Sequence, residues 1–329
     1  MQESVRRLFP GERRAFWEKT ILASEYIQEI RMRINRPVLI ISKGEDVYLD
    51  ESGNFIKQPK HAHLITEGEL EQLLMHLCQD SPYAFEEELR QGFLTAPGGH
   101  RIGVAGQAVP ESDGRIRTIK HIYYLNIRIA HQLFGIAEKI LPYMYEQGQL
   151  KNVLIVSPPG CGKTTLLREM VRRISDGNDY GKGVSVGVVD ERSEIAGSYL
   201  GRPQNDLGCR TDVLDACPKV QGMMLLLRSM SPRMIAVDEL GSIADVEALR
   251  TACACGSRVL ATVHGSGPED VAYKFPELLK SRIFDCVIVL ARRGGVPGVE
   301  RILQREDIEL AFGGSSIDSN RLYGAGLVV

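Results

Sequence analysis

The sequence predicts an α/β fold in which a parallel α/β domain follows a smaller α+β domain. The chain has 329 residues, 43% of them apolar, and single cores rarely grow past roughly 250–300 residues, so two cores are expected. Strand-like runs and turns fill the first part, whereas strand and helix patterns alternate from residue 148 to residue 293, as a parallel sheet requires. We therefore expect an N-terminal α+β domain (1–147), a parallel α/β domain (148–293) and a C-terminal extension (294–329).

The first twenty residues combine four arginines with Phe9, Phe16 and Trp17. Such a basic amphipathic segment could touch a membrane surface or a neighbouring subunit, or it could pack on its own domain. The runs 38–41 and 47–49 are apolar and lie among Gly, Asn and Pro, which predicts short strands joined by tight turns. Both patterns are typical of a small mixed domain.

A helix is predicted after Thr66, because Thr66 and Glu69 have the spacing of a capping box before leucines that share one helix face. Strand-like sequence returns between Arg101 and Ile129. The segment 133–145 is predicted as a second helix, which leads to the domain boundary at 147–149.

The second domain begins with an apolar strand (153–156), a loop (157–165) and an apolar-faced helix. This arrangement is a Walker A loop, which makes ATP or GTP the expected ligand. Its glycines let backbone N–H groups close on phosphate oxygens, its lysine reaches the β- and γ-phosphates, and the following hydroxyl can bind Mg²⁺. Ser157 stands where the pattern asks for Gly. The predicted phosphate-binding residues are Pro159, Gly160, Cys161, Gly162, Lys163, Thr164 and Thr165.

A second strand ends in acids. Four apolar residues (234–237) precede Asp238 and Glu239. Acids are also favoured at an ordinary helix N-terminus, but together with the upstream loop the pair reads as a Walker B motif. Asp238 is then a ligand of the Mg²⁺ shell, with Thr164, and Glu239 polarises the attacking water.

Two further strands are expected to end at the same sheet edge. One precedes Asp190 and Glu191, and the other delivers Thr262 and His264. Ligands of open parallel sheets lie at the carboxyl ends of the strands, so these side chains should face the phosphate site. A solvated acidic turn and a structural histidine are the alternatives.

The composition limits the classes of function. Forty basic and 42 acidic side chains give a formal net charge of −2, which argues against a protein that binds nucleic acid by general basicity. Seven scattered cysteines predict neither a disulfide framework nor a zinc site with paired arms. No apolar stretch reaches the roughly 20 residues that span a bilayer, and no signal peptide is visible, so we expect a cytoplasmic protein without a transmembrane segment.

The region from Leu227 to Gly265 resembles the core of the secretion ATPases of type II and type IV systems, which carry an Asp box, a Walker B strand and a His box in this order. The resemblance implies a RecA-like P-loop domain and a hexameric ring. It places Asp190 and Glu191 at the Asp box, Glu239 at the Walker B glutamate and His264 at the His box. In that family the N-terminal domain supplies arginines to the nucleotide, for which Arg101 and Arg128 are the candidates, with simple solvation or a salt bridge as the alternative.

The sequence differs from that of the secretion ATPases at two places near the Walker B strand. The chain has Asp238 where they have a Gly before the Walker B glutamate, and Leu240-Gly241-Ser242 where they have an Arg-Asp pair soon after it. With Asp238 at this position, we expect Mg²⁺ to be coordinated as in the common P-loop proteins.

A closer resemblance is to a family of stage III sporulation ATPases of endospore-forming bacteria, through the loop 158–165 and the segment 189–195. This likeness implies that the protein acts in the mother-cell cytoplasm, in part at the membrane face. It also implies membrane proteins of the channel between mother cell and forespore as partners.

The sequence thus predicts an ATPase that uses ATP and Mg²⁺, with Lys163 absorbing charge and Glu239 or Glu191 activating water. We name Glu239 first and keep Glu191 as the alternative. The arginine that completes a subunit-interface site stays open among Arg228, Arg282, Arg292 and Arg293. Two other functions remain: a nucleic-acid-stimulated RecA-like motor, and a nucleotide-gated scaffold with little turnover.

Overall fold

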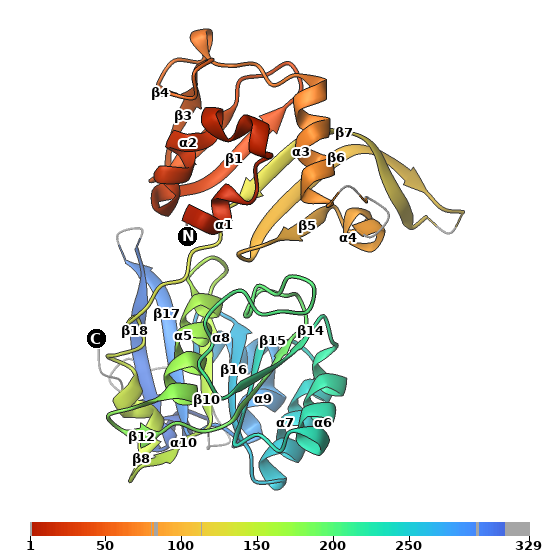
Figure 1. Ribbon diagram of the computed structural model, residues 1–329. Coiled ribbons are helices and arrows are strands. Elements are labelled where there is room, and N and C mark those ends of the chain that lie inside the picture. Colours follow the sequence, from red (N-terminus) through yellow and green to blue (C-terminus); the bar gives the residue numbers. More distant parts are fainter. Residues whose placement is uncertain (1, 80, 82–84, 113, 294–295, 313–329) are drawn as a thin grey trace. The chain divides into compact units, whose positions relative to one another are not determined.

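A computed structural model describes residues 2–79, 81, 85–112, 114–293 and 296–312 (Figure 1). Contacts divide the chain into two compact units, Met1–His131 with Gly197–Asn205, and Gln132–Ala196 with Asp206–Val329. This division differs from the boundary expected at residue 147. Both units combine helices with a β-sheet, and the predicted α/β class is confirmed.

The first unit contains an antiparallel sheet that has seven strands among the described residues, in the order β4-β3-β2-β1-β7-β6-β5. Its strands are β1 (Ile27–Arg33), β2 (Leu39–Ser42), β3 (Glu45–Leu49), β4 (Phe55–Ile56), β5 (Phe93–Ala96), β6 (His100–Pro110) and β7 (Ile116–Arg128). Its helices are α1 (Gln2–Arg6), α2 (Arg14–Leu22), α3 (Glu67–Leu77) and α4 (Glu86–Arg90), with 3-10 turns at Gly11–Arg13, Ser24–Tyr26 and Pro59–His61.

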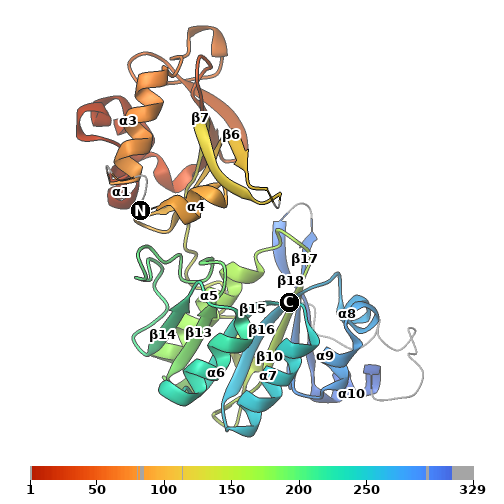
Figure 2. The ribbon, with the colours of Figure 1, turned by 90° about the vertical axis from the view of Figure 1, so that its right-hand side faces the viewer.

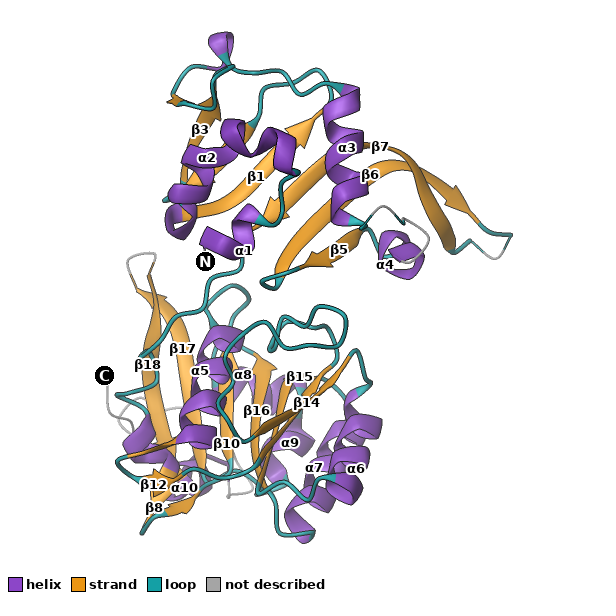
Figure 3. Cartoon of the chain, in the orientation of Figure 1, coloured by secondary structure: helices purple, strands orange, loops and turns teal. Residues whose placement is uncertain are grey.

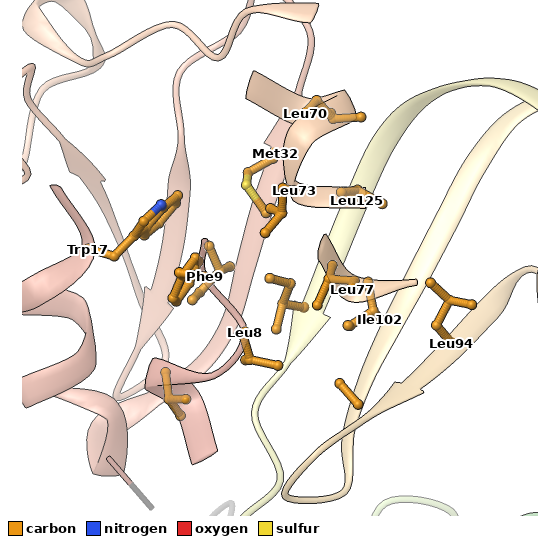
Figure 4. Close-up of a cluster of buried hydrophobic side chains, with 14 of the residues drawn as sticks. Leu8, Phe9, Trp17, Met32, Leu70, Leu73, Leu77, Leu94, Ile102 and Leu125 are labelled. Atoms are coloured by element: carbon orange, nitrogen blue, oxygen red, sulfur yellow. The ribbon is translucent and has the colours of Figure 1, made fainter. Parts of the chain in front are cut away.

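The core of the first unit lies between its helices and the sheet (Figure 4). Phe9 and Trp17 are buried in it with their ring centroids 4.3 Å apart, so the basic N-terminal segment packs on its own unit. The predicted capping box is confirmed at the start of α3. Thr66 Oγ1 accepts from Glu69 N, and Glu69 Oε2 accepts from Thr66 N at 2.8 Å.

A short segment from the second half of the sequence completes the first unit. Within Gly197–Asn205, Tyr199 bonds to Gln79, and the Gln204 side chain accepts from Gly98 N at 2.9 Å. Gly197 packs so closely on Gly99 that a Cβ on Gly99 would lie 3.2 Å from a backbone oxygen. No local pattern in the sequence indicates this placement.

The second unit is built on a sheet that has seven strands in the described part of the chain, in the order β14-β13-β15-β16-β10-β17-β18. Neighbouring strands of this sheet pair in parallel, except that β17 and β18 are antiparallel. The strands are β10 (Val153–Ser157), β13 (Val186–Asp190), β14 (Thr211–Asp215), β15 (Met234–Leu240), β16 (Arg258–His264), β17 (Cys286–Arg293) and β18 (Val296–Gln304). Two small hairpins pair β8 (Tyr145–Glu146) with β9 (Gln149–Leu150) and β11 (Gly177–Asn178) with β12 (Gly181–Lys182).

Helices cover both faces of this sheet, as Figure 2 shows. The helices are α5 (Lys163–Asp176), α6 (Lys219–Ser229), α7 (Ile243–Ala254), α8 (Pro268–Lys274), α9 (Pro276–Lys280) and α10 (Arg305–Phe312). Successive strand residues alternate between the two cores, so Ile155 packs with α5 and Leu154 with α7 and α9. Strands buried on both faces explain the continuous apolar runs of the sequence. The carboxyl ends of the parallel strands meet at one edge of the sheet (Figure 3).

One prediction about secondary structure was wrong. The segment 133–145 is not an α-helix but a series of turns and a 3-10 helix at Leu141–Met144, because Pro142 cannot donate the hydrogen bond that an α-helix needs. Its apolar residues Ile140 and Leu141 are fully buried in the core of the second unit. The C-terminal extension contributes β18, an edge strand of the second sheet, and α10, which follows it.

Candidate functional site

The loop between β10 and α5 has the backbone of an anion-binding loop. Gly160 and Gly162 have φ values of 70° and 84°, which favour glycine, and Gly162 precedes the first turn of α5. The first N–H groups of α5 have no partner within the helix and lie at its positive end. Ser157 is the last residue of β10 and is fully buried, with its hydroxyl bonded to the Pro158 oxygen at 2.8 Å. A regular strand needs no glycine there, which explains the departure from the motif.

The first residues of α5 meet the two acids at the end of β15. Lys163 Nζ donates to Glu239 Oε1 at 2.7 Å, and Thr164 Oγ1 donates to Asp238 Oδ2 at 2.6 Å. The Lys163 side chain is only 10% exposed. The residues of the two predicted motifs, 74 and 76 positions apart in sequence, therefore form one site.

Thr262 of β16 connects these acids to the neighbouring strand. Its hydroxyl donates to Asp238 Oδ1 and accepts the Glu239 N–H at 2.9 Å, and the residue is fully buried. The pairing of β15 with β16 shifts register between Val237 and Leu240, and Glu239 has a φ of 56°. This local bulge turns Glu239 away from the regular strand, and strain of this kind is typical of functional sites.

The Glu239 carboxylate is surrounded by basic groups. His264 Nε2 lies 3.0 Å from Oε1, beside Lys163, and Arg192 Nη1 lies 2.5 Å from Oε2. Burial alone raises the pKa of Glu239, but hydrogen bonds and charges from Lys163, His264 and Arg192 outweigh it and lower the pKa below its usual value. Glu239 is therefore ionised at neutral pH.

The loop after β13 approaches the same acids. The Asp190 carboxylate is 2% exposed and accepts from the N–H groups of Glu194 and Ala196 at 2.9 and 2.8 Å, which fixes the loop. Burial raises the pKa of Asp190, with those N–H groups opposing the rise. The Glu191 side chain forms an ion pair with Lys219. A small pocket has Asp190, Glu191, Arg192, Asp238 and Glu239 among its lining residues.

The residues fit a nucleotide with Mg²⁺. A Cβ on Gly162 would meet nothing within 4 Å, so its positive φ alone requires glycine, as in a loop whose amides converge on phosphate. Among the described residues, no group of three or more His, Cys, Asp and Glu side chains could hold a metal ion by itself. Thr164 and Asp238 supply an incomplete set of oxygen ligands, and Mg²⁺ in nucleotide sites takes its remaining ligands from phosphate and water.

The match to a family of known proteins extends over most of the chain. The family model of sporulation stage III, protein AA, matches residues 1–310. The chain belongs to this family. It is 43% identical over 282 residues to stage III sporulation protein AA of Bacillus subtilis (strain 168), a match that covers 85% of this chain and 87% of that protein.

Solved structures show the same fold at low sequence identity. The ATPase DotB of Legionella pneumophila has a TM-score of 0.60 at 16% identity, with 94% of this chain and 87% of that chain covered. The pilus retraction motor PilT, solved with bound ADP, has a TM-score of 0.58 at 16% identity, with 89% and 85% covered. The sporulation family therefore shares its fold with these ATPases and motors.

The structure brings most of the predicted site residues of this family member together. Lys163 and Thr164 of the loop bond to Glu239 and Asp238, and His264 also contacts Glu239, whereas Glu191 contacts Lys219. Arg101 and Arg128 belong to the first unit, where Arg101 lies 3.7 Å from the centre of the Phe93 ring and Arg128 lies 3.7 Å from Glu29. Their role at the nucleotide remains a proposal.

Sequence reasoning missed one residue of the site and left a second, Thr262, without a role. The contact of Arg192 with Glu239 was not predicted, although Arg192 directly follows the acids after β13. Thr262 was placed at the correct sheet edge without a function. Arg292, one of the four candidate arginines, donates to the Gly160 oxygen at 2.8 Å and so contacts the loop of its own chain.

Proposed function

We propose that this protein binds ATP with Mg²⁺ and hydrolyses it to ADP and phosphate. The observation that carries the proposal is the meeting of Lys163 and Thr164 with Glu239 and Asp238 in one site. The amides of the loop and Lys163 hold the phosphates, and Thr164 and Asp238 hold Mg²⁺. The ion offsets the negative charge of the phosphate oxygens when it is bound.

Glu239 is proposed as the general base, in preference to Glu191. The Glu239 carboxylate is ionised at neutral pH, and it lies beside Lys163, the residue that reaches the γ-phosphate in such loops. The Glu239 carboxylate takes a proton from water as the water oxygen bonds to the γ-phosphorus and the bond to the bridging oxygen breaks. His264 and Arg192 hold the carboxylate in place. Glu191 is engaged by Lys219 instead.

The biological role is proposed from family membership and fold. We infer that the protein forms a hexameric ring in the mother-cell cytoplasm. There it energises or assembles the channel between mother cell and forespore through membrane-protein partners. The fold of a pilus retraction motor supports a mechanical role, since closure around nucleotide can drive rigid-body motion. In such a ring Arg101 and Arg128 would serve the nucleotide site. No helix in the described part of the chain is long and apolar enough to cross a membrane.

The proposed activity is tested by steady-state phosphate release with Mg²⁺ and ATP. We expect turnover in the wild type, none above background in Lys163→Ala, a fall of at least tenfold in Glu239→Gln and near-normal turnover in Glu191→Gln. Full activity of Glu239→Gln contradicts the choice of base. Binding of ATP without turnover in the wild type would favour a nucleotide-gated scaffold, and stimulation by DNA or RNA would favour a nucleic-acid motor.

The ring is tested by sedimentation of the full chain with and without a slowly hydrolysed ATP analogue. A hexamer is expected at high protein concentration in the presence of the analogue. A monomer under both conditions argues against the ring without affecting the proposed chemistry.

A further inference from the structure

A second cavity lies at the amino ends of the strands, at the sheet edge opposite to the phosphate loop. Its volume is about 280 Å³. Arg233 immediately precedes β15 and Arg258 begins β16, whereas Glu239 and His264 lie at the far ends of the same strands. At about 3.3 Å per residue, roughly 20 Å separates the two sites. In Figure 1 the hairpins β8–β9 and β11–β12, which also line the cavity, lie at the lower end of the second unit.

The lining of this cavity is strongly basic. It includes Lys182, Arg233 and Arg258, and no carboxylate is among the residues that line it. None of the three cations forms an ion pair with another residue of the described chain. The three residues are exposed, and positive charges that line one cavity favour the binding of an anion.

Backbone hydrogen bonds hold these cations beside one another. Arg258 N donates to the Arg233 oxygen at 2.8 Å, and Arg233 N donates to the Ser185 oxygen at 3.0 Å. Ser185 follows Lys182 by three residues, so the three basic side chains arise from adjoining segments. The Tyr145 ring, which is 8% exposed, forms part of the wall. The backbone positions from which these exposed side chains extend are therefore fixed by the sheet.

We propose that this cavity binds a small ligand that carries phosphate groups. A phosphate group has several oxygens and up to two charges, so two guanidinium groups and one ammonium group can contact it together, whereas a carboxylate offers only two oxygens. The volume of about 280 Å³ lies just below the range for small-molecule sites, roughly 300–1,000 Å³, which favours a small ligand over a protein segment. The proposal is independent of nucleotide hydrolysis at the other edge of the sheet.

The test is a calorimetric titration of the full-length protein with pyrophosphate at about 0.1 M salt, where charges more than roughly 10 Å apart are largely screened. The Lys163→Ala variant is used, so that the phosphate loop does not account for the binding, and circular dichroism checks that it is folded. We expect saturable binding of one pyrophosphate per chain. The additional double substitution Arg233→Gln/Arg258→Gln should weaken it at least tenfold.

Arg250→Gln in the same background is the matched control, because Arg250 is an exposed arginine of α7 that pairs with Glu247 and does not line the cavity. It should leave pyrophosphate binding unchanged. The proposal is wrong if Lys163→Ala shows no saturable binding, or if binding survives the double substitution. If citrate binds as tightly as pyrophosphate, the inference that the ligand carries phosphate groups is wrong.

Discussion

Thr262 offers the sharpest test of how this site is assembled. The substitution Thr262→Val keeps the β-branched shape of a fully buried side chain and removes only its hydroxyl. That hydroxyl donates to Asp238 and accepts from the backbone of Glu239, so a single change removes the link between β16 and both acids. No cavity is created, and any loss of function can be assigned to the lost hydrogen bonds.

The expected magnitude follows from those two bonds. A hydrogen bond to a charged group contributes about 1.5–3 kcal/mol, and the Glu239 N–H keeps a second acceptor in Asp238 Oδ1 at 3.1 Å. For a domain of this size, such a loss lowers the melting temperature by about 3–12 °C. If the same energy is lost from the transition state, turnover falls at least tenfold. Because Asp238 is a proposed Mg²⁺ ligand, we also expect half-saturation to require about tenfold more Mg²⁺.

The matched variant is Thr262→Ser, which keeps the hydroxyl and loses one buried methyl group worth about 0.8 kcal/mol. It should keep its Mg²⁺ dependence and most of its turnover while melting a few degrees lower. Both variants are measured by phosphate release over a Mg²⁺ series and by thermal unfolding. Wild-type Mg²⁺ dependence in Thr262→Val, or equal impairment of the two variants, would refute the reasoning.

Three further predictions concern charge and packing. The pKa of Glu239 lies below its usual value of 4.5, so the ionised carboxylate stabilises the fold above pH 4.5, and this stability is lost as the pH falls through the lowered pKa. In an acid titration followed by circular dichroism, Glu239→Gln should reduce this loss of stability, and a titration curve identical to that of the wild type would contradict the prediction. The charge of Arg192 helps to lower that pKa, so Arg192→Ala should move the acidic limb of the pH–turnover profile to higher pH while Arg192→Lys moves it less; identical profiles would contradict this role. Leu141→Ala should destabilise the second unit by about 2–5 kcal/mol in urea unfolding, whereas Leu133→Ala, at a side chain that is 53% exposed, should cost far less; equal effects would remove Leu141 from the core.

The parts of the fold that the sequence predicted correctly depend on local patterns. The strand before Ser157, the loop and α5 form a continuous motif, and Asp238 follows a run of apolar residues that can only be a buried strand. The capping box at Thr66 was recognised for the same reason, because its two partners are three residues apart. In each case neighbours in the sequence contain the physical cause of the structure.

The features that the sequence did not reveal depend on distant partners. The segment 197–205 belongs to the first unit through contacts with Gln79 and Gly98, more than 100 residues away. β18 contains Pro297 and Gly298, which are unfavourable in strands, and it forms a strand through its antiparallel pairing with β17. The segment 133–145 has the apolar spacing of a helix, but Pro142 prevents one, and burial against α5 determines its place. The spacing of apolar residues in a sequence predicts which surface is buried, but it does not predict which other segment packs against that surface.

The engagement of Glu239 has a consequence for the order of events at the site. Lys163 Nζ lies 2.7 Å from Glu239 Oε1, so a bound γ-phosphate would compete with Glu239 for this lysine, and we expect an exchange of one anionic partner of Lys163 for another. His264 and Arg192 contact Glu239 independently of Lys163, and they can hold the carboxylate while the lysine moves. The positive φ of Glu239 and the Thr262 hydroxyl fix its backbone during the exchange. We therefore expect the arrival of the nucleotide to weaken the contact between Lys163 and the proposed base, while His264 and Arg192 keep the carboxylate in place.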